Sequence, residues 1–161
     1  MAKILLVDDN EYTLYILGRM LRKNLFEVKE CRDGVETLEA VQTFKPDLIL
    51  LDIRMPRMDG YETCTRLKSD EQTKNIPIII QTATASDIPD KIRGFNLGAT
   101  DYVTFPINFD ELLARVNTQL RIRELEKKLI ESERLKAISE IVLTMHHEIN
   151  NPLAVIQGWT Q

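Results

Sequence analysis

The sequence predicts an α/β fold in which a doubly wound parallel sheet lies between two layers of helices. Short, continuously apolar runs recur along the chain, and such runs are typical of strands that are buried on both faces of a parallel sheet. The segments between these runs carry apolar residues at helical spacing, which suits the crossover helices that parallel strands need. Two of the apolar runs end in aspartates, and ligands bind such sheets just beyond the carboxyl ends of the strands. The fold and the position of a site are therefore predicted together.

The first half of the chain supplies three strands and two helices. Lys3–Asp9, KILLVDD, is an apolar run closed by two aspartates, and Glu11–Asn24 follows it with leucines at helical spacing. Phe26–Cys31 is a short second strand that ends before an Asp-Gly turn, and helix Val35–Phe44 follows that turn. Asp47–Asp52, DLILLD, then repeats the pattern of the first strand.

The second half continues the alternation of helix and strand. A loop with Pro and Gly in turn positions leads to helix Tyr61–Asp70, and Ile76–Thr82, IPIIIQT, is a fourth strand that ends in a hydroxyl. Helix Ile88–Leu97 stops at a glycine, as helices commonly do, and Asp101–Thr104 is a fifth strand. Because crossovers between parallel strands are right-handed, these five strands predict a flavodoxin-like sheet.

The last helix is predicted to be much longer than a compact domain needs. It begins near Phe109, and neither Pro nor Gly occurs from Asp110 to about Ile149, so roughly 40 residues at about 1.5 Å each give a rod of about 60 Å. A narrow seam of residues spaced three and four apart follows the rod and is typical of a coiled coil. The seam residues are Ile122, Leu125, Leu129, Ser132, Leu135, Ile138, Val142, Met145 and Ile149. The short step from Ser132 to Leu135 predicts a stammer, and a single solvated helix is the alternative to a dimeric coiled coil.

The composition is that of an ordinary soluble protein. Its 161 residues suit one domain of roughly 120 residues and a smaller second part. With 29% charged residues and a formal net charge of −4, no nucleic-acid-binding surface is expected. No apolar run approaches the roughly 20 residues that span a bilayer and no signal peptide is present, so we expect no membrane contact and a cytoplasmic location. Cys31 and Cys64 match no metal spacing and are expected to be buried thiols.

Three carboxylates are predicted to meet at one edge of the sheet. Asp8, Asp9 and Asp52 are far apart in sequence, but they close two buried parallel strands whose carboxyl ends lie side by side. Like charges repel one another unless a cation holds them, and Mg²⁺ prefers oxygen ligands, so the cluster indicates a magnesium site. The alternative is that Asp8, Asp9 or Asn10 only caps the helix that follows.

A second possible site lies near the end of the chain, in the octet HHEINNPL at residues 146–153. If Leu135 occupies an a position of the heptad, His147 falls at f and faces outward. An exposed imidazole beside a carboxylate has a nitrogen available as a nucleophile, with Glu148 accepting its proton.

Four stretches of the chain together resemble the signature regions of response-regulator receiver domains of two-component systems. They are LLVDDN, LLDIRMPRMDG, IIIQTA and DYVTFP, and the resemblance covers Met1 to about Gln119. The segment Ser139–Gln161 is similar to the first helix of the dimerisation and phosphoacceptor domain of sensor histidine kinases, whose H-box resembles HEINNPL. The two resemblances imply a receiver at residues 1–119, a coiled-coil signalling helix at 120–138 and a truncated kinase helix at 139–161. The implied parent is a hybrid-type histidine kinase, and without its ATP-binding domain this chain is expected to have no autokinase activity.

The resemblance assigns a role to each matching residue of the receiver part. Asp52 is implied as the phosphoacceptor, whose carboxylate would attack a phosphohistidine in line. Thr82 aligns with the hydroxyl that swings to a phosphoryl oxygen, and Tyr102 aligns with the aromatic ring that moves with it. The implied Mg²⁺ ligands are Asp9, Asp52, Asp8 through a water molecule, and the backbone carbonyl of Arg54.

In the kinase-like segment, His147 aligns with the phosphoacceptor, Glu148 with its acid/base neighbour, and Asn151 with the polar residue that helps to remove phosphoryl groups. The implied partners are a second copy of the chain through the coiled coil, an upstream phosphodonor histidine kinase or phosphotransfer protein, and the missing ATP-binding domain.

Phe105 departs from the family pattern, which has a lysine just before the proline that follows the fifth strand. Its loss removes an ammonium group that would pair with the phosphoryl oxygens. We expect phosphorylation of Asp52 to survive, with a weakened or rewired coupling to Thr82 and Tyr102. The family geometry also predicts a cis bond between Phe105 and Pro106.

Three functions compete on these observations. The first is a phosphorylation-controlled switch that regulates an attached histidine kinase through the coiled-coil helix. The second is a pseudo-receiver that no longer switches and serves as a constitutive dimerisation and docking module. The third, a response regulator with a helical tail and no effector domain, leaves the H-box unexplained.

Overall fold

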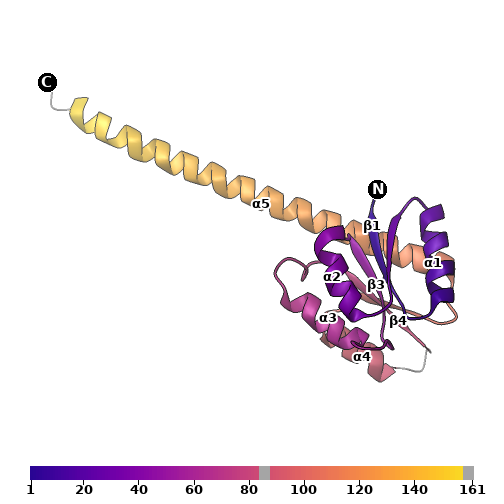
Figure 1. Ribbon diagram of the computed structural model, residues 1–161. Helices are drawn as coiled ribbons and strands as arrows, with labels where there is room; N and C mark the ends of the chain where they lie inside the picture. The colour runs from indigo at the N-terminus through magenta and orange to yellow at the C-terminus, as the bar shows by residue number, and fades with distance from the viewer. Residues whose placement is uncertain (84–87, 158–161) are drawn as a thin grey trace. The chain divides into compact units, whose positions relative to one another are not determined.

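The computed structural model describes residues 1–83 and 88–157, with side chains described to residue 150. Five parallel strands form one sheet in the order β2-β1-β3-β4-β5 (Figure 1). The strands are β1 (Lys3–Val7), β2 (Glu27–Cys31), β3 (Leu48–Asp52), β4 (Ile78–Thr82) and β5 (Asp101–Thr104). The helices are α1 (Glu11–Lys23), α2 (Gly34–Phe44), α3 (Gly60–Ser69), α4 (Ile88–Asn96) and α5 (Phe109–Gln157). The predicted flavodoxin-like sheet is confirmed.

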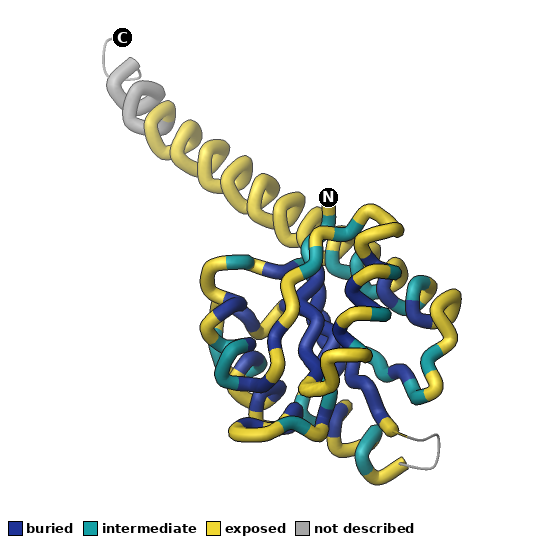
Figure 2. The backbone as a smooth tube through the Cα atoms, turned by 45° about the vertical axis from the view of Figure 1, so that its right-hand side comes forward, coloured by how far each residue is buried: buried dark blue, intermediate teal, exposed yellow. Residues whose placement is uncertain are grey.

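Two hydrophobic cores lie on the two faces of the sheet. Successive residues of a strand point to opposite faces, so Leu5 and Val7 of β1 join one core while Ile4 and Leu6 join the other. Side chains of α2 and α3 complete the first core, and side chains of α1 and the start of α5 complete the second. Figure 2 shows the strands as the buried centre of this domain, with exposed helix surfaces around them. The continuously apolar runs are therefore explained by burial on both faces.

The observed boundaries differ from the predicted ones at a few ends. The fourth strand begins at Ile78, after Pro77, since proline has no N–H to donate to a neighbouring strand. The last helix runs from Phe109 to Gln157 and so passes through Pro152, beyond the stretch from Asp110 to about Ile149 that contains neither Pro nor Gly. Proline removes one helical hydrogen bond but does not force a helix to end.

The chain divides into two compact units, Met1–Arg123 and Glu124–Gln161. Arg123 closes the first unit, because its guanidinium donates hydrogen bonds to the backbone oxygens of Asp47, at 2.6 Å, and Pro46, at 3.2 Å. In the second unit every residue from 124 to 150 is exposed, including the apolar seam residues. Within the described residues, no helix has the length and hydropathy needed to cross a bilayer.

Gly60, the first residue of α3, lies against the end of β3. A Cβ atom at this position would fall on the backbone carbonyl oxygen of Asp52 and 2.7 Å from the Cα of Ile53. Both obstacles are backbone atoms, which cannot rotate away as the end of a side chain does. We therefore predict that Gly60→Ala lowers the free energy of unfolding by about 2 kcal/mol, within the usual range for overpacking.

Gly18, inside α1, supplies the matched control for a denaturant titration. A Cβ atom there would meet the Oε1 atom of Glu30 at 2.6 Å, but that atom is the end of a flexible side chain. Alanine is also the better helix former, so Gly18→Ala should cost less than about 0.5 kcal/mol. Equal losses for the two variants would contradict the packing assigned to Gly60.

Candidate functional site

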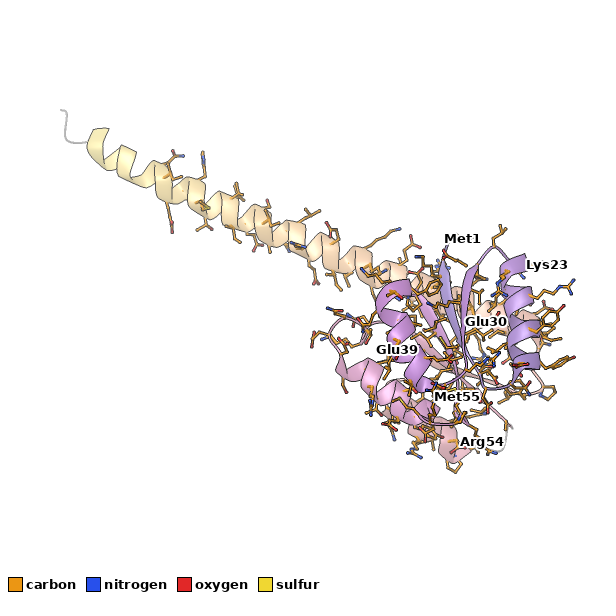
Figure 3. All side chains as sticks on the ribbon, in the orientation of Figure 1. Met1, Lys23, Glu30, Glu39, Arg54 and Met55 are labelled. Carbon is orange, nitrogen blue, oxygen red and sulfur yellow. The ribbon has the colours of Figure 1, made fainter. Side chains whose placement is uncertain are left out.

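The carboxyl ends of β1 and β3 bring three acidic side chains together. The two strands are in register, with Val7 beside Leu51, so Asp8 and Asp52 follow at the same level of the sheet. One carboxylate oxygen from each of Asp8, Asp9 and Asp52 lies within 4.8 Å of the others. Figure 3 labels Arg54, two residues beyond β3, at the end of the domain opposite Met1. The structure thus places the acidic cluster at the edge that the sequence predicts.

Capping of α1 is carried by Asn10 and not by either aspartate. The Asn10 side-chain oxygen accepts hydrogen bonds from the backbone N–H groups of Tyr12, at 2.9 Å, and Thr13, at 3.3 Å. Asp8 instead accepts a hydrogen bond of 2.8 Å from the Asn10 N–H, which fixes the turn between β1 and α1. Helix capping therefore does not explain why two carboxylates precede this helix.

Burial makes the acidic cluster electrostatically costly. Asp8 is only 3% exposed, and desolvation together with the charge of Asp9 raises its pKa from 3.8 to about 6. Desolvation, followed by repulsion from Asp8, raises the pKa of Asp52 from 3.8 to about 7. Each ionised carboxylate therefore disfavours ionisation of its neighbour, and a cation among the three would relieve the repulsion.

The donor set suits a hard divalent cation. Three carboxylates whose oxygens lie within 4.8 Å of one another are suitable ligands for Mg²⁺, which binds oxygen and keeps part of its water shell. Arg54 lies in the exposed loop after β3 and lines the same cavity, where its backbone carbonyl is predicted to add a fourth oxygen.

The cavity above the acidic cluster is walled by residues from several strands and loops. Its lining comprises Asp8, Asp9, Asn10, Thr13, Asp52, Ile53, Arg54, Gln81, Thr82, Ala83, Asp90 and Phe105. Thr82 is buried, and its hydroxyl donates to the backbone oxygen of Val103 at 3.4 Å. Phe105 stands where the family lysine was expected, and its bond to Pro106 is cis, as predicted.

Tyr102, the predicted aromatic partner of Thr82, contacts both neighbouring helices. Its ring meets the Phe95 ring edge-on at 5.8 Å between centroids, and the Lys91 ammonium lies 4.1 Å from its centre. Arg115 of α5 lies 5.5 Å from the same ring and pairs with Asp101 at 2.8 Å. A movement of Tyr102 would therefore disturb α4 and α5 together.

An ion pair that the sequence did not reveal holds the loop after Asp52. The Arg57 Nε atom donates to Asp33 at 2.7 Å, and Asp33 also accepts from the Glu36 N–H as the cap of α2. Arg57 has a positive φ of 63°, a conformation that non-glycine residues adopt rarely. No spacing signal could have shown this pair, because its partners are 24 residues apart on different loops.

The kinase-like segment carries no comparable assembly of side chains within the described residues. His147 and Glu148 are exposed on the second unit, and the nearby polar contact joins His146 and Asn150 at 2.9 Å. The side chain of Asn151 lies outside the described residues. The predicted roles of these residues therefore remain predictions.

Comparison with known proteins identifies relatives of this chain. The family model of the response regulator receiver domain matches residues 4–117. The chain is 39% identical over 121 residues to the DNA-binding dual master transcriptional regulator RpaA of Synechocystis, covering 75% of this chain and 50% of that protein. It is 38% identical over 141 residues to the alkaline phosphatase synthesis transcriptional regulatory protein PhoP of Bacillus subtilis, covering 88% and 58%. The chain thus spans about half the length of these curated relatives.

Among solved structures, one similar chain is the receiver domain of a sensor histidine kinase from Pseudomonas aeruginosa, with a magnesium ion coordinated in its active-site cleft. The two share 29% sequence identity with a TM-score of 0.69, and the match covers 74% of this chain and 97% of that one.

We predict that the acidic cluster destabilises the metal-free protein at neutral and higher pH. The folded state binds protons more tightly than the unfolded chain at Asp8 and Asp52. The resulting loss of folding stability is therefore absent below about pH 4 and complete above about pH 7. Asp8→Asn should therefore raise the free energy of unfolding in EDTA by about 2 kcal/mol at pH 8 and by almost nothing at pH 4.

Denaturant titrations with and without Mg²⁺ check this prediction. At pH 8, Mg²⁺ should stabilise the wild type and stabilise Asp8→Asn much less. Asp110→Asn is the control, because this exposed aspartate does not line the cavity, and it should behave as the wild type. If Mg²⁺ raises the free energy of unfolding of the wild type and of Asp8→Asn by the same amount, the proposed metal site is contradicted.

Proposed function

The chain belongs to the response regulator receiver domain family, and on that premise we propose that it is a phosphorylation-controlled switch attached to a histidine kinase. The observation that carries the proposal is the convergence of Asp8, Asp9 and Asp52 within 4.8 Å in a cavity that Thr82 also lines. A carboxylate nucleophile, a set of cation ligands and a hydroxyl are the parts that phosphoryl transfer to a protein needs.

Asp52 is the proposed phosphoacceptor because it ends a central strand and opens into the cavity. Its carboxylate oxygen attacks phosphorus while the bond between phosphorus and the donor's leaving atom breaks, and the electron pair leaves with the donor. Asp8, Asp9 and the backbone carbonyl of Arg54 complete the proposed ligands of Mg²⁺. Bound Mg²⁺ would neutralise the phosphoryl oxygens and favour the ionised form of Asp52. The side chain of Asp52 must lose its proton first, since its pKa without metal is about 7.

The proposed output runs through Tyr102 to α5. A phosphoryl group that draws in the Thr82 hydroxyl would empty space beside β5, and the Tyr102 ring would follow it. That ring contacts Phe95 on α4 and Arg115 on α5, so both helices receive the change. Because α5 is one helix from Phe109 to Gln157, the proposed coiled coil and His147 lie on the same element.

Dimerisation through the second unit is part of the proposal. In the single chain the seam residues from Leu125 to Ile149 are exposed, with Leu129 at 60% and Ile149 at 63%. A stripe of exposed aliphatic side chains at three-four spacing is what a parallel coiled coil buries. His147 and Glu148 flank this seam and are proposed as the phosphoacceptor and acid/base pair of the attached kinase.

Phe105 favours a second candidate, the constitutive docking module. Among the described residues that line the cavity, none supplies an ammonium group to stabilise a phosphoryl oxygen, and Phe105 stands at the position expected for it. This alternative predicts dimers whose properties are independent of Mg²⁺ and of a phosphodonor.

We predict that the chain gains one phosphoryl group from acetyl phosphate and Mg²⁺ and that Asp52→Ala abolishes the gain. Intact-mass spectrometry measures the product directly. Asp110→Ala, which leaves the cavity unchanged, should be phosphorylated at the wild-type rate. An unmodified wild type that retains its fold would reject the switch and favour the docking module.

We predict that Ile138→Glu weakens the dimer about 100-fold, because it would place two desolvated charges in the apolar seam. Ala137→Glu adds the same charge one residue away at an outward c position and should leave the dimer intact. Size-exclusion chromatography with light scattering, over a series of concentrations, gives both dissociation constants. A monomeric wild type at high concentration would rule out the coiled coil.

A further inference from the structure

Gln81 is a polar residue on the fully buried strand β4. It is 0% exposed, and neither its Oε1 nor its Nε2 atom has a partner among the residues that the structure describes. Most buried amide groups in folded proteins are hydrogen-bonded, since leaving one unpaired costs free energy. An unpaired group that lines a cavity is thus a candidate contact for whatever enters that cavity.

The sheet places Gln81 directly beside Asp52. The two residues are in register on neighbouring parallel strands, β4 and β3, so their side chains project to the same face. Both line the cavity above the acidic cluster. The following residue, Thr82, lies on the opposite face of the strand, like Ile80 two positions earlier. Gln81 and Thr82 therefore flank the proposed phosphorylation site from two sides of the sheet.

The described part of the cavity wall is poor in positive charge. It contains four aspartates, and its one basic residue is Arg54, whose side chain is exposed. Phe105, at the expected lysine position, offers no donor. A phosphoryl group on Asp52 would present oxygens that need hydrogen-bond donors as well as a cation. Gln81 Nε2 is a buried side-chain amide nitrogen without a partner among the described residues, on the strand position paired with Asp52.

We propose that the Gln81 side-chain amide donates a hydrogen bond to a phosphoryl oxygen on Asp52 and so takes over part of the role of the lysine that Phe105 replaces. This inference rests on the proposed phosphorylation of Asp52. Gln81 transfers no proton: it keeps both amide hydrogens while the bond from Asp52 to phosphorus forms and the donor's bond breaks. A neutral donor supplies less stabilisation than a cation, so the replacement is partial.

The experiment compares the wild type with Gln81→Met and with the double variant Gln81→Met/Phe105→Lys. Methionine has nearly the same length and shape as glutamine but no amide, so the buried position stays filled. Initial phosphorylation rates are measured by intact mass with acetyl phosphate and saturating Mg²⁺, and thermal unfolding is followed in parallel.

The expected result is a loss of about tenfold in the phosphorylation rate of Gln81→Met with no loss of thermal stability, because the amide bonds to none of the described residues in the unphosphorylated protein. The double variant should recover most of the rate, since an ammonium group then supplies the donor. The affinity of Gln81→Met for Mg²⁺ alone should equal that of the wild type, which a general distortion of the site would not produce.

The outcomes separate this inference from the proposed function. If the wild type is phosphorylated on Asp52 and Gln81→Met reacts within twofold of its rate, the role of Gln81 is overturned and the switch stands. If the wild type takes up no phosphoryl group, the proposed switch and the role of Gln81 are both rejected. If Gln81→Met unfolds, Gln81→Leu serves as the second apolar variant under the same criteria.

Discussion

Mutual repulsion among three carboxylates is the constraint on which the site depends. Parallel pairing of β1 and β3 brings Asp8 and Asp52 to the same level of the sheet, and their carboxylate oxygens lie within 4.8 Å of each other. The apolar side chains of the two strands are fully buried, so the cores supply the stability that holds the charges together. A fold can tolerate such a cluster only if its remaining interactions are strong, and a cluster of this kind gains stability when a cation binds.

The elements around the cluster hold it at fixed geometry. Gly60 allows the start of α3 to approach the end of β3, and the Gly60 N–H donates to the Ile53 oxygen at 2.9 Å. The ion pair of Arg57 with Asp33 fastens the same loop to the start of α2. These contacts fix the backbone on both sides of Arg54, whose carbonyl is the proposed fourth ligand. A loop that moved freely would lose the arrangement that selects a small cation with strict geometry.

Much of the fold and of the acidic cluster was predictable from the sequence, because burial on both faces leaves an unbroken apolar run in β1, β3 and β4. The carboxylates were found because they close such runs. The assignment of the helix cap to Asn10 was not predictable, since three successive residues could all serve and only the turn geometry chooses among them. Gln81 was missed although a signal was present: it directly follows three isoleucines in the strand IIIQT, all of which is buried. The pairing of Arg57 with Asp33 depends on two loops that meet only in the folded chain.

The helix α5 joins two environments, and this is the strongest physical reason to expect a partner. Leu112 and Val116, near its start, are fully buried against the sheet, whereas Leu135 and Val142 on the same helix are nearly 60% exposed. Burial of such side chains contributes about 25 cal/mol per Å² of apolar surface. A second copy of the chain that covered this continuous apolar stripe would therefore stabilise a dimer. No Gly or Pro occurs between Asp110 and Ile149 to act as a hinge. On the proposed function, a shift imposed at Arg115 would therefore be passed along the helix to the irregular step from Ser132 to Leu135, where two registers of the seam are expected to compete, and from there to His147.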